Sequence, residues 1–355
     1  MACPHHHDRL RLLFVKLKHI GDALLLTPTL VAARAQYPNA EIWVVVRKGT
    51  EGILAGCPAI DQLITVSPVE SDQRGPSSLW HDLRTLLHLR RQHFDYAFEL
   101  SDGDRGRWLA GMSRAKKRCV NNSLNRLNPW WRLLFNHVSV TPWTQGHRVE
   151  KDFLTVTDCL KLPSDIPALC FEKSDTIVPE SIRDLHDFAI IHPGSRWISK
   201  RWPKEHWIRL GQSLLKQTKC IVVSCGPAID ERKLAAELVA KLGSKHAFSS
   251  DGQWTWAELA ACMHRTRVLV GVDTAAIHLA AACQCPIVGI YSHTLMHQWK
   301  PWCAQGQLLH PGQWMNSREE ILQIRASEIM RSHQPEKVLA AVREIMRAPI
   351  PNQAE

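Results

Sequence analysis

The sequence predicts an α/β protein of two domains, each built on a parallel sheet. Short apolar runs rich in β-branched residues alternate with helical segments over the first 70 residues, and the alternation begins again near residue 188. A chain of 355 residues is too long for one hydrophobic core, and 45% hydrophobic residues can fill two. Residues 163–179 lose this periodicity and contain several prolines, which indicates a linker. We expect domains at residues 1–170 and 180–330.

The elements expected in the first domain follow one another as strand and helix. The strands are short apolar runs at residues 11–16, 41–46, 62–66 and 96–100. The helices have apolar positions at helical spacing and lie at residues 23–37, 52–57, 78–92, 108–113 and 148–160. Residues 67–78 are polar and rich in Pro, Gly and Ser, so we expect a loop there. Residues 114–118 are a basic segment without a predicted element.

The second domain repeats the pattern. Its expected strands lie at residues 188–191, 220–224, 268–272 and 287–291. Its expected helices lie at residues 204–218, 230–242, 256–264, 275–282, 319–328 and 335–346. We expect the last segment, residues 331–355, to form a helix that packs back on the first domain. Two such halves place a cleft between their strand-end loops, where open α/β sheets bind ligands.

Composition limits the classes of function. No run reaches the roughly 18 apolar residues of a membrane span, and the N-terminus lacks a signal-peptide cleavage site, so we expect a cytosolic protein. The 11 cysteines are scattered without a CxxC pair, which favours reduced thiols over disulfides or zinc. No GxGxxG follows the first strand of either half, which disfavours a dinucleotide oxidoreductase. The net charge of +10 indicates an anionic partner: nucleic acid, a phosphorylated substrate or an acidic membrane face.

The segment 268–291 predicts a strand, a helix and a second strand around a candidate anion site. Asp273 and Thr274 lie where the first strand ends and the helix begins. The N–H groups at a helix start attract anions, and small residues such as Ala275 let a ligand approach the backbone. His278 lies in the same helix. The alternative is an ordinary capped crossover helix.

Two further strand-end loops carry polar residues. In HPGSRWISKRWP, residues 192–203, Gly194 and Ser195 offer hydrogen-bond donors and Lys200 a point charge for a phosphate; a basic surface loop is the alternative. In GPAIDE, residues 226–231, Asp230 or Glu231 either accepts hydrogen bonds from a ribose or complements the helix dipole. Trp254 offers a face for an adenine ring.

In the first domain, Asp22 lies at a helix start after the first strand, beside Lys16, Lys18 and His19. Its carboxylate is either a helix cap or a general base that takes a proton from a hydroxyl nucleophile. A second loop, after the strand at residues 96–100, contains a DxD pair flanked by arginines. We expect it to bind an anionic acceptor rather than a metal, through residues Asp102, Asp104, Arg105 and Arg107.

Four motifs together resemble one enzyme family. The chain has Gly21-Asp22 after its first strand, then HPGSRWISKRWP, GPAIDE and VGVDTAAIHLAAA. In this order they are similar, over nearly the whole chain, to the lipopolysaccharide heptosyltransferases of glycosyltransferase family 9. Within the family the chain most resembles the enzymes that add the third, branching heptose of the inner core. One departure is Ala275, where the family usually has glycine, which bears on how closely a phosphate approaches.

The resemblance implies a GT-B fold of two Rossmann-like domains with a cleft between them, the first binding the acceptor and the second the nucleotide sugar. It implies an inverting transfer of heptose from ADP-L-glycero-β-D-manno-heptose to a heptose of the lipid A–core oligosaccharide, without a cofactor or metal. By similarity Asp22 is the catalytic base, and Lys200 binds the diphosphate. The donor site would further use Gly194, Ser195, Asp230, Glu231, Trp254, Asp273, Thr274, Ala275 and His278. Lys16, Lys18 and His19 would join the arginine-rich loop at the acceptor.

By the same resemblance the enzyme would be cytoplasmic and peripheral, held at the anionic inner face of the inner membrane. Two other functions stay open. A GT-B-fold sugar-nucleotide epimerase, or a transferase of another sugar, would share the donor loops. A nucleic-acid-binding protein would use the same basic charge, but no recognition motif supports it and we expect no nucleic-acid partner.

Overall fold

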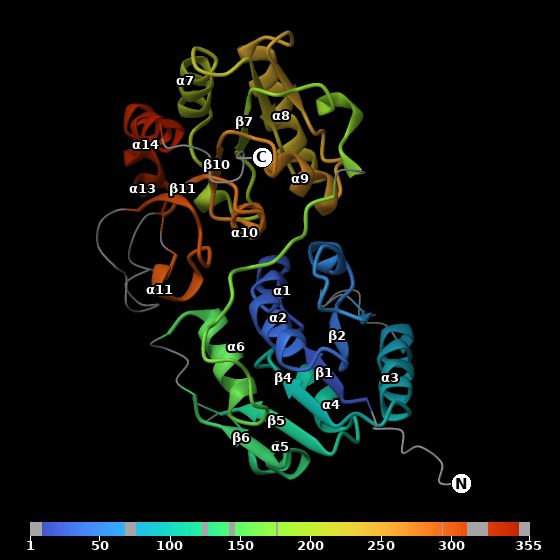
Figure 1. The fold of residues 1–355 in the computed structure, drawn as a ribbon. Helices are drawn as coiled ribbons and strands as arrows, with labels where there is room; N and C mark the ends of the chain where they lie inside the picture. Colours follow the sequence, from blue (N-terminus) through green and yellow to red (C-terminus); the bar gives the residue numbers. More distant parts are fainter. Residues whose placement is uncertain are drawn as a thin grey trace. The chain divides into compact units, whose positions relative to one another are not determined.

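The computed structural model describes residues 9–67, 76–122, 127–141, 146–174, 177–292, 294–310 and 326–347. The chain divides into two compact units, Met1–Cys170 and Phe171–Glu355. Each unit contains one six-stranded sheet whose paired strands are parallel (Figure 1). The predicted α/β class with parallel sheets is therefore confirmed. In the described part of the chain, no helix is long and apolar enough to cross a membrane.

The sheet of the first unit has the strand order β3-β2-β1-β4-β5-β6. Its strands are β1 Arg11–Val15, β2 Glu41–Arg47, β3 Gln62–Val66, β4 Tyr96–Glu99, β5 Lys117–Asn121 and β6 His137–Ser139. Residues 12–15 of the central strand β1 are fully buried, as expected for a parallel strand covered on both faces. The chain crosses from one side of β1 to the other between β3 and β4. The carboxyl ends of β1 and β4 therefore lie at the point where such sheets usually bind ligands.

Helices of the first unit pack on this sheet. They are α1 Ile20–Leu24, α2 Thr27–Gln36, η1 Glu51–Leu54, α3 Pro76–Arg90, α4 Asp104–Gly111, α5 Pro129–Leu134 and α6 Arg148–Thr157. Leu13 and Val15 of β1 share one hydrophobic cluster with Leu86 of α3, Leu109 of α4 and Leu134 of α5. Because Leu13 and Val15 point to the same side of the strand, α3, α4 and α5 cover one face of the sheet. Elsewhere in the unit α2 packs against α6.

The second unit has the same doubly wound arrangement. Its sheet order is β12-β11-β10-β7-β8-β9, with β7 and β10 at the centre. The strands are β7 Phe188–His192, β8 Cys220–Val223, β9 Ala247–Ser249, β10 Leu269–Val272, β11 Ile287–Ile290 and β12 Gly306–Leu309. The helices are η4 Glu180–Ile182, η5 Ile198–Lys200, α7 Lys204–Leu214, α8 Ile229–Leu242, α9 Trp256–Met263, α10 Ala275–Ala282, α11 Met296–Trp299, α13 Ala326–Ser332 and α14 Pro335–Arg347.

The terminal helix α14 belongs to the second unit. Val338, Ala341 and Val342 on its apolar side are buried in the core cluster that also contains Leu210 and Leu214 of α7. Figure 1 shows α14 next to α7. We expected this helix to pack back on the first domain; the structure shows its packing within the second unit, on α7. Its buried stripe recurs at a spacing of three and four residues, which specifies an apolar partner but not which one.

One long predicted helix is two helices in the structure. Residues 23–37 form α1, which begins at Ile20, and α2, which begins at Thr27 with Pro28 in its first turn. Pro28 has no N–H to continue the first helix. Thr27 Oγ1 donates to the Leu24 carbonyl at 2.8 Å, which satisfies a carbonyl at the end of α1.

Several short elements had no counterpart among the predicted ones: β5, α5, β6, β9, α11 and β12. They span three to six residues each, too short to show a period. Strand β5 begins with Lys117 and Arg118, inside the basic segment for which we predicted no element. Residues 68–75 of the predicted polar loop and residues 319–325 of a predicted helix lie outside the described residues.

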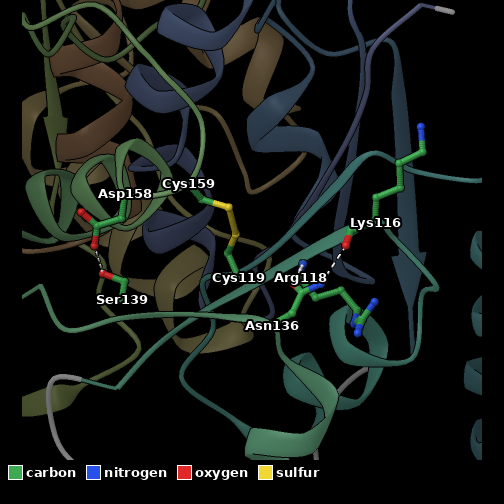
Figure 2. The surroundings of a disulfide bond; sticks show 7 residues. All are labelled: Lys116, Arg118, Cys119, Asn136, Ser139, Asp158 and Cys159. Carbon is green, nitrogen blue, oxygen red and sulfur yellow. Dashed lines mark hydrogen bonds between the residues drawn. A yellow bond between two sulfur atoms is a disulfide. The ribbon is translucent and has the colours of Figure 1, made fainter.

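Cys119 in β5 and Cys159 after α6 form a disulfide, shown in Figure 2. This pair is one exception to the expectation that the cysteines are reduced. Residues 40 apart in sequence meet because α6 packs against β5. The strand is also held by Asn136, whose Oδ1 accepts from the Arg118 N–H at 2.7 Å and whose Nδ2 donates to the Lys116 carbonyl at 2.8 Å.

Candidate functional site

The loops that carry the predicted site residues follow strands at and beside the centres of the two sheets. In the second unit they follow β7, β8 and β10, with Trp254 in the loop after β9, and in the first unit they follow β1 and β4. Because all strands of a parallel sheet point the same way, these loops gather at the carboxyl ends of the strands of each sheet. Each unit therefore presents its own group of polar residues.

A lysine and an aspartate form an ion pair at the carboxyl ends of the central strands of the second sheet. Lys200 ends η5 in the loop after β7, and Asp273 directly follows β10. Lys200 Nζ donates to Asp273 Oδ2 at 2.5 Å, and the two side chains are 20% and 9% exposed. Burial alone would raise the pKa of Asp273, but the Lys200 ammonium and the hydroxyl of Thr294 lower it overall. The pair holds a partly accessible cation beside the start of α10.

The start of α10 has hydrogen-bonding groups that the helix itself does not use. Thr274 is the N-cap residue, but its side chain makes no capping hydrogen bond. Its buried Oγ1 has no partner among the described residues. The N–H groups of the first turn, including that of Ala275, have no acceptor within the helix, and the helix dipole is positive there. With Lys200 alongside, this arrangement suits an anion.

The loop after β7 places Gly194 and Ser195 at the same carboxyl ends of the strands. Ser195 is 3% exposed, and its Oγ accepts from the Trp197 N–H at 3.3 Å. Its carbonyl accepts from Arg201 Nε at 2.8 Å, which holds the loop in place. His278, in α10, is 6% exposed and close enough to Asp273 to favour its ionised form.

The two acidic residues of GPAIDE have different surroundings. Asp230 is 56% exposed, and its Oδ2 accepts from Arg201 at 2.5 Å. Glu231 instead points to the loops after β7 and β8: its Oε2 accepts from the Gly226 N–H at 2.9 Å. A Cβ added to Gly194 would lie 2.4 Å from the same oxygen, and one added to Gly226 would lie 2.9 Å from it. Both glycines are therefore required for this carboxylate to sit beside the strand ends.

Trp254 is half-buried and lies in the loop after β9. Its ring meets the ring of Phe248 edge to face, with 6.5 Å between the ring centroids. This loop is packed on GPAIDE. Gly252 has a φ of +64°, and a Cβ there would lie 2.5 Å from the Gly226 carbonyl oxygen. The tight approach, possible only for glycine, brings Trp254 near the carboxylate-bearing loop.

In the first unit, Asp22 has one oxygen engaged and one not. Oδ2 accepts from the His19 N–H at 3.2 Å at the start of α1. Oδ1 is buried and has no hydrogen-bond partner among the described residues. The two predicted roles, cap and base, are therefore compatible because they use different oxygens. Beside it Lys18 is half-buried, and the ring of exposed His19 lies 3.2 Å from Arg47 at the end of β2.

We expected Lys16 to contact the acceptor, but its side chain is not accessible to one. It is fully buried, and its ammonium donates to Asp152 in α6. Asp152 also lies 3.0 Å from Arg148 Nη2, and both side chains are almost fully buried. Burial lowers the pKa of Lys16, with repulsion from Arg148 adding to the effect. We therefore correct Lys16 to a structural residue beneath the Asp22 loop.

The DxD loop after β4 is also held by α6. Arg148 Nη1 donates to Asp102 Oδ2 at 2.6 Å, and Lys151 Nζ donates to Oδ1 at 2.6 Å. Burial opposes ionisation of Asp102, but these two cations hold its pKa well below the ordinary value. Both carboxylate oxygens are thus used within the protein. Asp102 adopts a left-handed φ of 57°, a conformation that Asp tolerates better than most residues.

The arginines of this loop are engaged as well, which corrects their expected acceptor role. Arg105 donates to both oxygens of Asp82 in α3, at 2.7 and 2.6 Å, and to the Ser67 carbonyl. Arg107 is 9% exposed and donates to Asp104 Oδ1 at 2.9 Å. Asp104 itself, with a side chain 74% exposed, is the most accessible of the loop residues that we singled out.

Glu99, the last residue of β4, is a buried carboxyl that sequence reasoning missed. It is 1% exposed; Oε1 accepts from the Ser101 N–H at 2.8 Å, and Oε2 has no partner among the described residues. Burial first, then the nearby Asp102 carboxylate, raises its pKa to about 7. Gly106 of α4 allows this, because a Cβ there would lie 2.5 Å from Oε1.

Sequence reasoning also missed Arg148, Lys151 and Asp152 in α6. Their spacing of three and four residues is usual for ion pairs on a solvated helix face. The available signal is that Val149, Phe153 and Val156 are apolar on the same helix, which leaves little of its surface for water. In the described part of the chain, no group of three or more His, Cys, Asp or Glu side chains is arranged to hold a metal.

Doubly wound sheets with a cation and a helix start at the switch point are typical of α/β proteins that bind nucleotides or other phosphates. Residues 83–320 match glycosyltransferase family 9 (heptosyltransferase), and the chain belongs to this family. It is therefore a glycosyltransferase. Asp22 lies before the matched residues, whereas Lys200, Glu231 and Asp273 lie within them.

Individual relatives agree with this assignment. The chain is 23% identical over 292 residues to lipopolysaccharide heptosyltransferase 3 of Escherichia coli, covering 79% of this chain and 83% of that protein. It resembles the glycosyltransferase family 9 structure from Veillonella parvula with a TM-score of 0.77 and 19% identity, covering 96% and 98% of the two chains. It resembles E. coli heptosyltransferase WaaC with ADP-2-deoxy-2-fluoro heptose with a TM-score of 0.76 and 18% identity, covering 94% and 99%. The fold is thus GT-B, with two Rossmann-like domains.

Proposed function

We propose that the protein transfers L-glycero-D-manno-heptose from ADP-heptose to a heptose of the lipopolysaccharide inner core, with inversion at the anomeric carbon. The observation that carries the proposal is the Lys200–Asp273 pair beside the start of α10. The relatives named as lipopolysaccharide heptosyltransferases supply the sugar and the acceptor class. The WaaC structure with an ADP-heptose analogue supports the donor.

The donor site assigned to the second unit follows from charge. Lys200, the first-turn N–H groups at Thr274 and Ala275, and the Ser195 hydroxyl would bind the diphosphate. As the bond to the sugar breaks, negative charge grows on the departing ADP, and fixed donors stabilise it without reorganisation. Asp273 keeps the ammonium oriented toward the helix start through its 2.5 Å contact.

The remaining donor contacts distinguish the nucleoside. Glu231 is assigned to the ribose hydroxyls, since its carboxylate lies at the strand ends, whereas Asp230 forms an ion pair with Arg201. Trp254 is assigned to the adenine, and His278 helps to keep Asp273 ionised. Of the two carboxylates that the sequence leaves open for the ribose, we therefore propose Glu231.

Asp22 is assigned as the general base. Its Oδ1 has no hydrogen-bond partner among the described residues and is the oxygen that we assign to the acceptor hydroxyl, while Oδ2 remains in the helix cap. A base in this role takes the proton as the acceptor oxygen attacks the anomeric carbon from the face opposite to ADP. Lys18, His19 and Asp104 are assigned to the acceptor because none of the three is buried. Lys16 and Arg107 are buried, and Asp102 and Arg105 each make two charged hydrogen bonds to neighbouring helices.

We further propose that the heptose added is the third, branching one, and that catalysis needs no divalent metal. The first rests on the likeness to heptosyltransferase 3, and the second on the positive charge that Lys200 and α10 already provide. Mass spectrometry of products from acceptors with one, two or three heptoses identifies the position. Full turnover in excess EDTA is expected, and dependence on added metal contradicts the second proposal.

The central test uses matched lysines. Lys200→Ala removes the proposed diphosphate contact, and we expect kcat/KM for heptose transfer to fall about 10²-fold or more. Lys204→Ala removes an equal charge from a surface pair with Glu237 and should leave transfer unchanged. Equal activity of the two variants refutes the donor site. A protein that only isomerises ADP-heptose is an epimerase, and salt-sensitive RNA binding that survives Lys200→Ala points to nucleic acid.

The proposed acceptor is anchored in a membrane, so we propose a cytoplasmic enzyme that associates peripherally with the inner face of the inner membrane. Cell fractionation after a high-salt wash tests this. A peripheral protein is released by salt, and a protein that is never found in the membrane fraction contradicts the proposal.

A further inference from the structure

We propose that the exposed side of α3 is the surface through which the first unit docks on an anionic lipid bilayer. Four large apolar side chains of this helix face outward: Leu79 is 68% exposed, Trp80 64%, Leu83 36% and Leu87 45%. Trp80, Leu83 and Leu87 follow the spacing i, i+3, i+7, so they form one continuous stripe along the helix. Single exposed apolar residues are ordinary on protein surfaces, but a stripe of this kind is not.

The stripe is not needed to hold the helix in place. The opposite side of α3 carries Leu86 and Leu89, which are buried in the cluster with Leu13 and Val15 of the central strand. Arg105 of α4 holds Asp82 from the neighbouring helix with two hydrogen bonds. The helix is thus anchored by one face, and the apolar stripe remains on the other.

The charges of α3 favour an anionic surface. Arg84 is exposed and lies four residues after Trp80, which places it along the same stripe, and the exposed Arg91 directly follows the last residue of the helix. Asp82, the only carboxylate among residues 76–91, is turned to Arg105 instead. Long arginine side chains can keep their guanidinium groups at phosphate depth while neighbouring leucines enter the acyl region.

A second pair of exposed apolar side chains lies on α5, which covers the same face of the sheet as α3. Trp130 and Leu133 of α5 are 79% and 75% exposed, and the exposed Arg132 lies between them. Helix α4 packs against α5 and is tied to α3 by Arg105, so the three helices form one layer. Tryptophan beside arginine is typical of residues at a membrane–water interface. Two such groups of side chains give a wider contact than one helix alone.

A lipid surface fits this layer better than a protein partner does. Helix α3 carries an apolar stripe and basic side chains along its length, as interfacial helices do. That the lipid surface serves to bring the enzyme to a membrane-anchored acceptor rests on the proposed function. The α3 stripe is itself distinct from the residues assigned to donor and acceptor.

Flotation of the full chain with vesicles tests the proposal. Wild-type protein is expected to bind phosphatidylglycerol-containing vesicles and to bind pure phosphatidylcholine vesicles much less. Trp80→Glu with Leu87→Glu should weaken binding to the anionic vesicles about tenfold or more. Arg84→Gln with Arg91→Gln should weaken it about 25-fold at low salt, since each arginine near the surface contributes on the order of fivefold.

Matched controls keep the result specific. Val140→Glu places a carboxylate at an equally exposed apolar position outside the layer, and Lys241→Gln with Lys245→Gln removes two exposed charges from the second unit. Both should bind vesicles as wild type does. If the double glutamate variant fails to fold, Trp80→Ser alone, checked by circular dichroism, is measured instead and should also lose binding.

Three outcomes overturn the proposal: wild-type protein that does not bind anionic vesicles, stripe variants that bind as tightly as wild type, or a wild-type dimer that the glutamate variant converts to a monomer without any lipid binding. Heptose transfer to a lipid-free core oligosaccharide is measured in parallel. The stripe variants should retain it fully. Its absence in wild type rejects the proposed function, whereas the vesicle result stands separately.

Discussion

Replacing Asp22 separates the two roles that its carboxylate can have. Oδ2 accepts from the His19 N–H at 3.2 Å, and the buried Oδ1 has no partner among the described residues. Asp22→Asn keeps an oxygen for the cap but removes the negative charge that a base needs. Asp22→Ala removes both. The pair of variants therefore distinguishes a cap from a base.

The two variants should differ in stability but not in turnover. Loss of the cap in Asp22→Ala costs about 1 kcal/mol, which lowers the Tm of a domain of this size by about 2–4 °C. Asp22→Asn should cost less; its main loss is the attraction to the buried cations Lys16 and Arg148, whose charged forms the Asp22 carboxylate favours. Turnover should fall about 10²-fold or more in both variants, because neither has a base.

The assay is single-turnover heptose transfer at saturating donor and acceptor, with ADP-heptose affinity measured separately by calorimetry. We expect the affinity of both variants to stay close to that of wild type, since the donor contacts belong to the second unit. Wild-type turnover in Asp22→Asn refutes the general-base assignment. A fall in turnover that matches the loss of thermal stability, large in Ala and small in Asn, shows that the carboxylate acts only as a cap.

Three other predictions concern carboxyl side chains. Asp152→Ala should lower the unfolding free energy by about 3–5 kcal/mol, because it leaves the Lys16 ammonium buried without its partner; urea unfolding checks this, and Lys16→Met with Asp152→Leu should lose far less. Glu231→Gln should raise KM for ADP-heptose about tenfold, while Asp230→Asn changes it less than about twofold; equal effects contradict the ribose assignment. The pKa of Glu99 is about 7 in the folded protein against 4.5 ordinarily, so the folded state binds the extra proton and stability falls as pH rises from about 4.5 to 7. Glu99→Gln should therefore raise the unfolding free energy by about 3 kcal/mol at pH 8 and not at pH 4, and a gain that is independent of pH contradicts this.

Long elements with a clear period were predictable, and short ones were not. The strands at the sheet centres are continuous apolar runs because parallel strands are buried on both faces, so β1, β7 and β10 were found within one or two residues. Strands at the sheet edges, such as β6 and β9, have only three residues each. Hydrogen bonding to an inner strand, which the local sequence does not encode, decides their existence.

The donor loops were predictable because each lies at a strand end, where the fold class alone places ligand-binding groups. The partners of the first unit were not. Lys16 looked accessible beside Asp22, but α6, more than 130 residues later in the chain, covers it and supplies Asp152 at a separation of 136. Arg105 likewise looked free until α3 supplied Asp82.

By itself the sequence determined the two parallel α/β halves, the loops that end their central strands and the family to which they belong, because these depend on local periodicity and on motifs a few residues long. Only the tertiary structure decided which charges remain available. It buried Lys16, engaged Asp102 and Arg105 in ion pairs, turned Glu231 rather than Asp230 to the strand ends, and gave one oxygen of Asp22 no hydrogen-bond partner among the residues that the structure describes. The reason is physical: a charged side chain is neutralised by whatever packs against it, and contacts between distant segments set that neighbour.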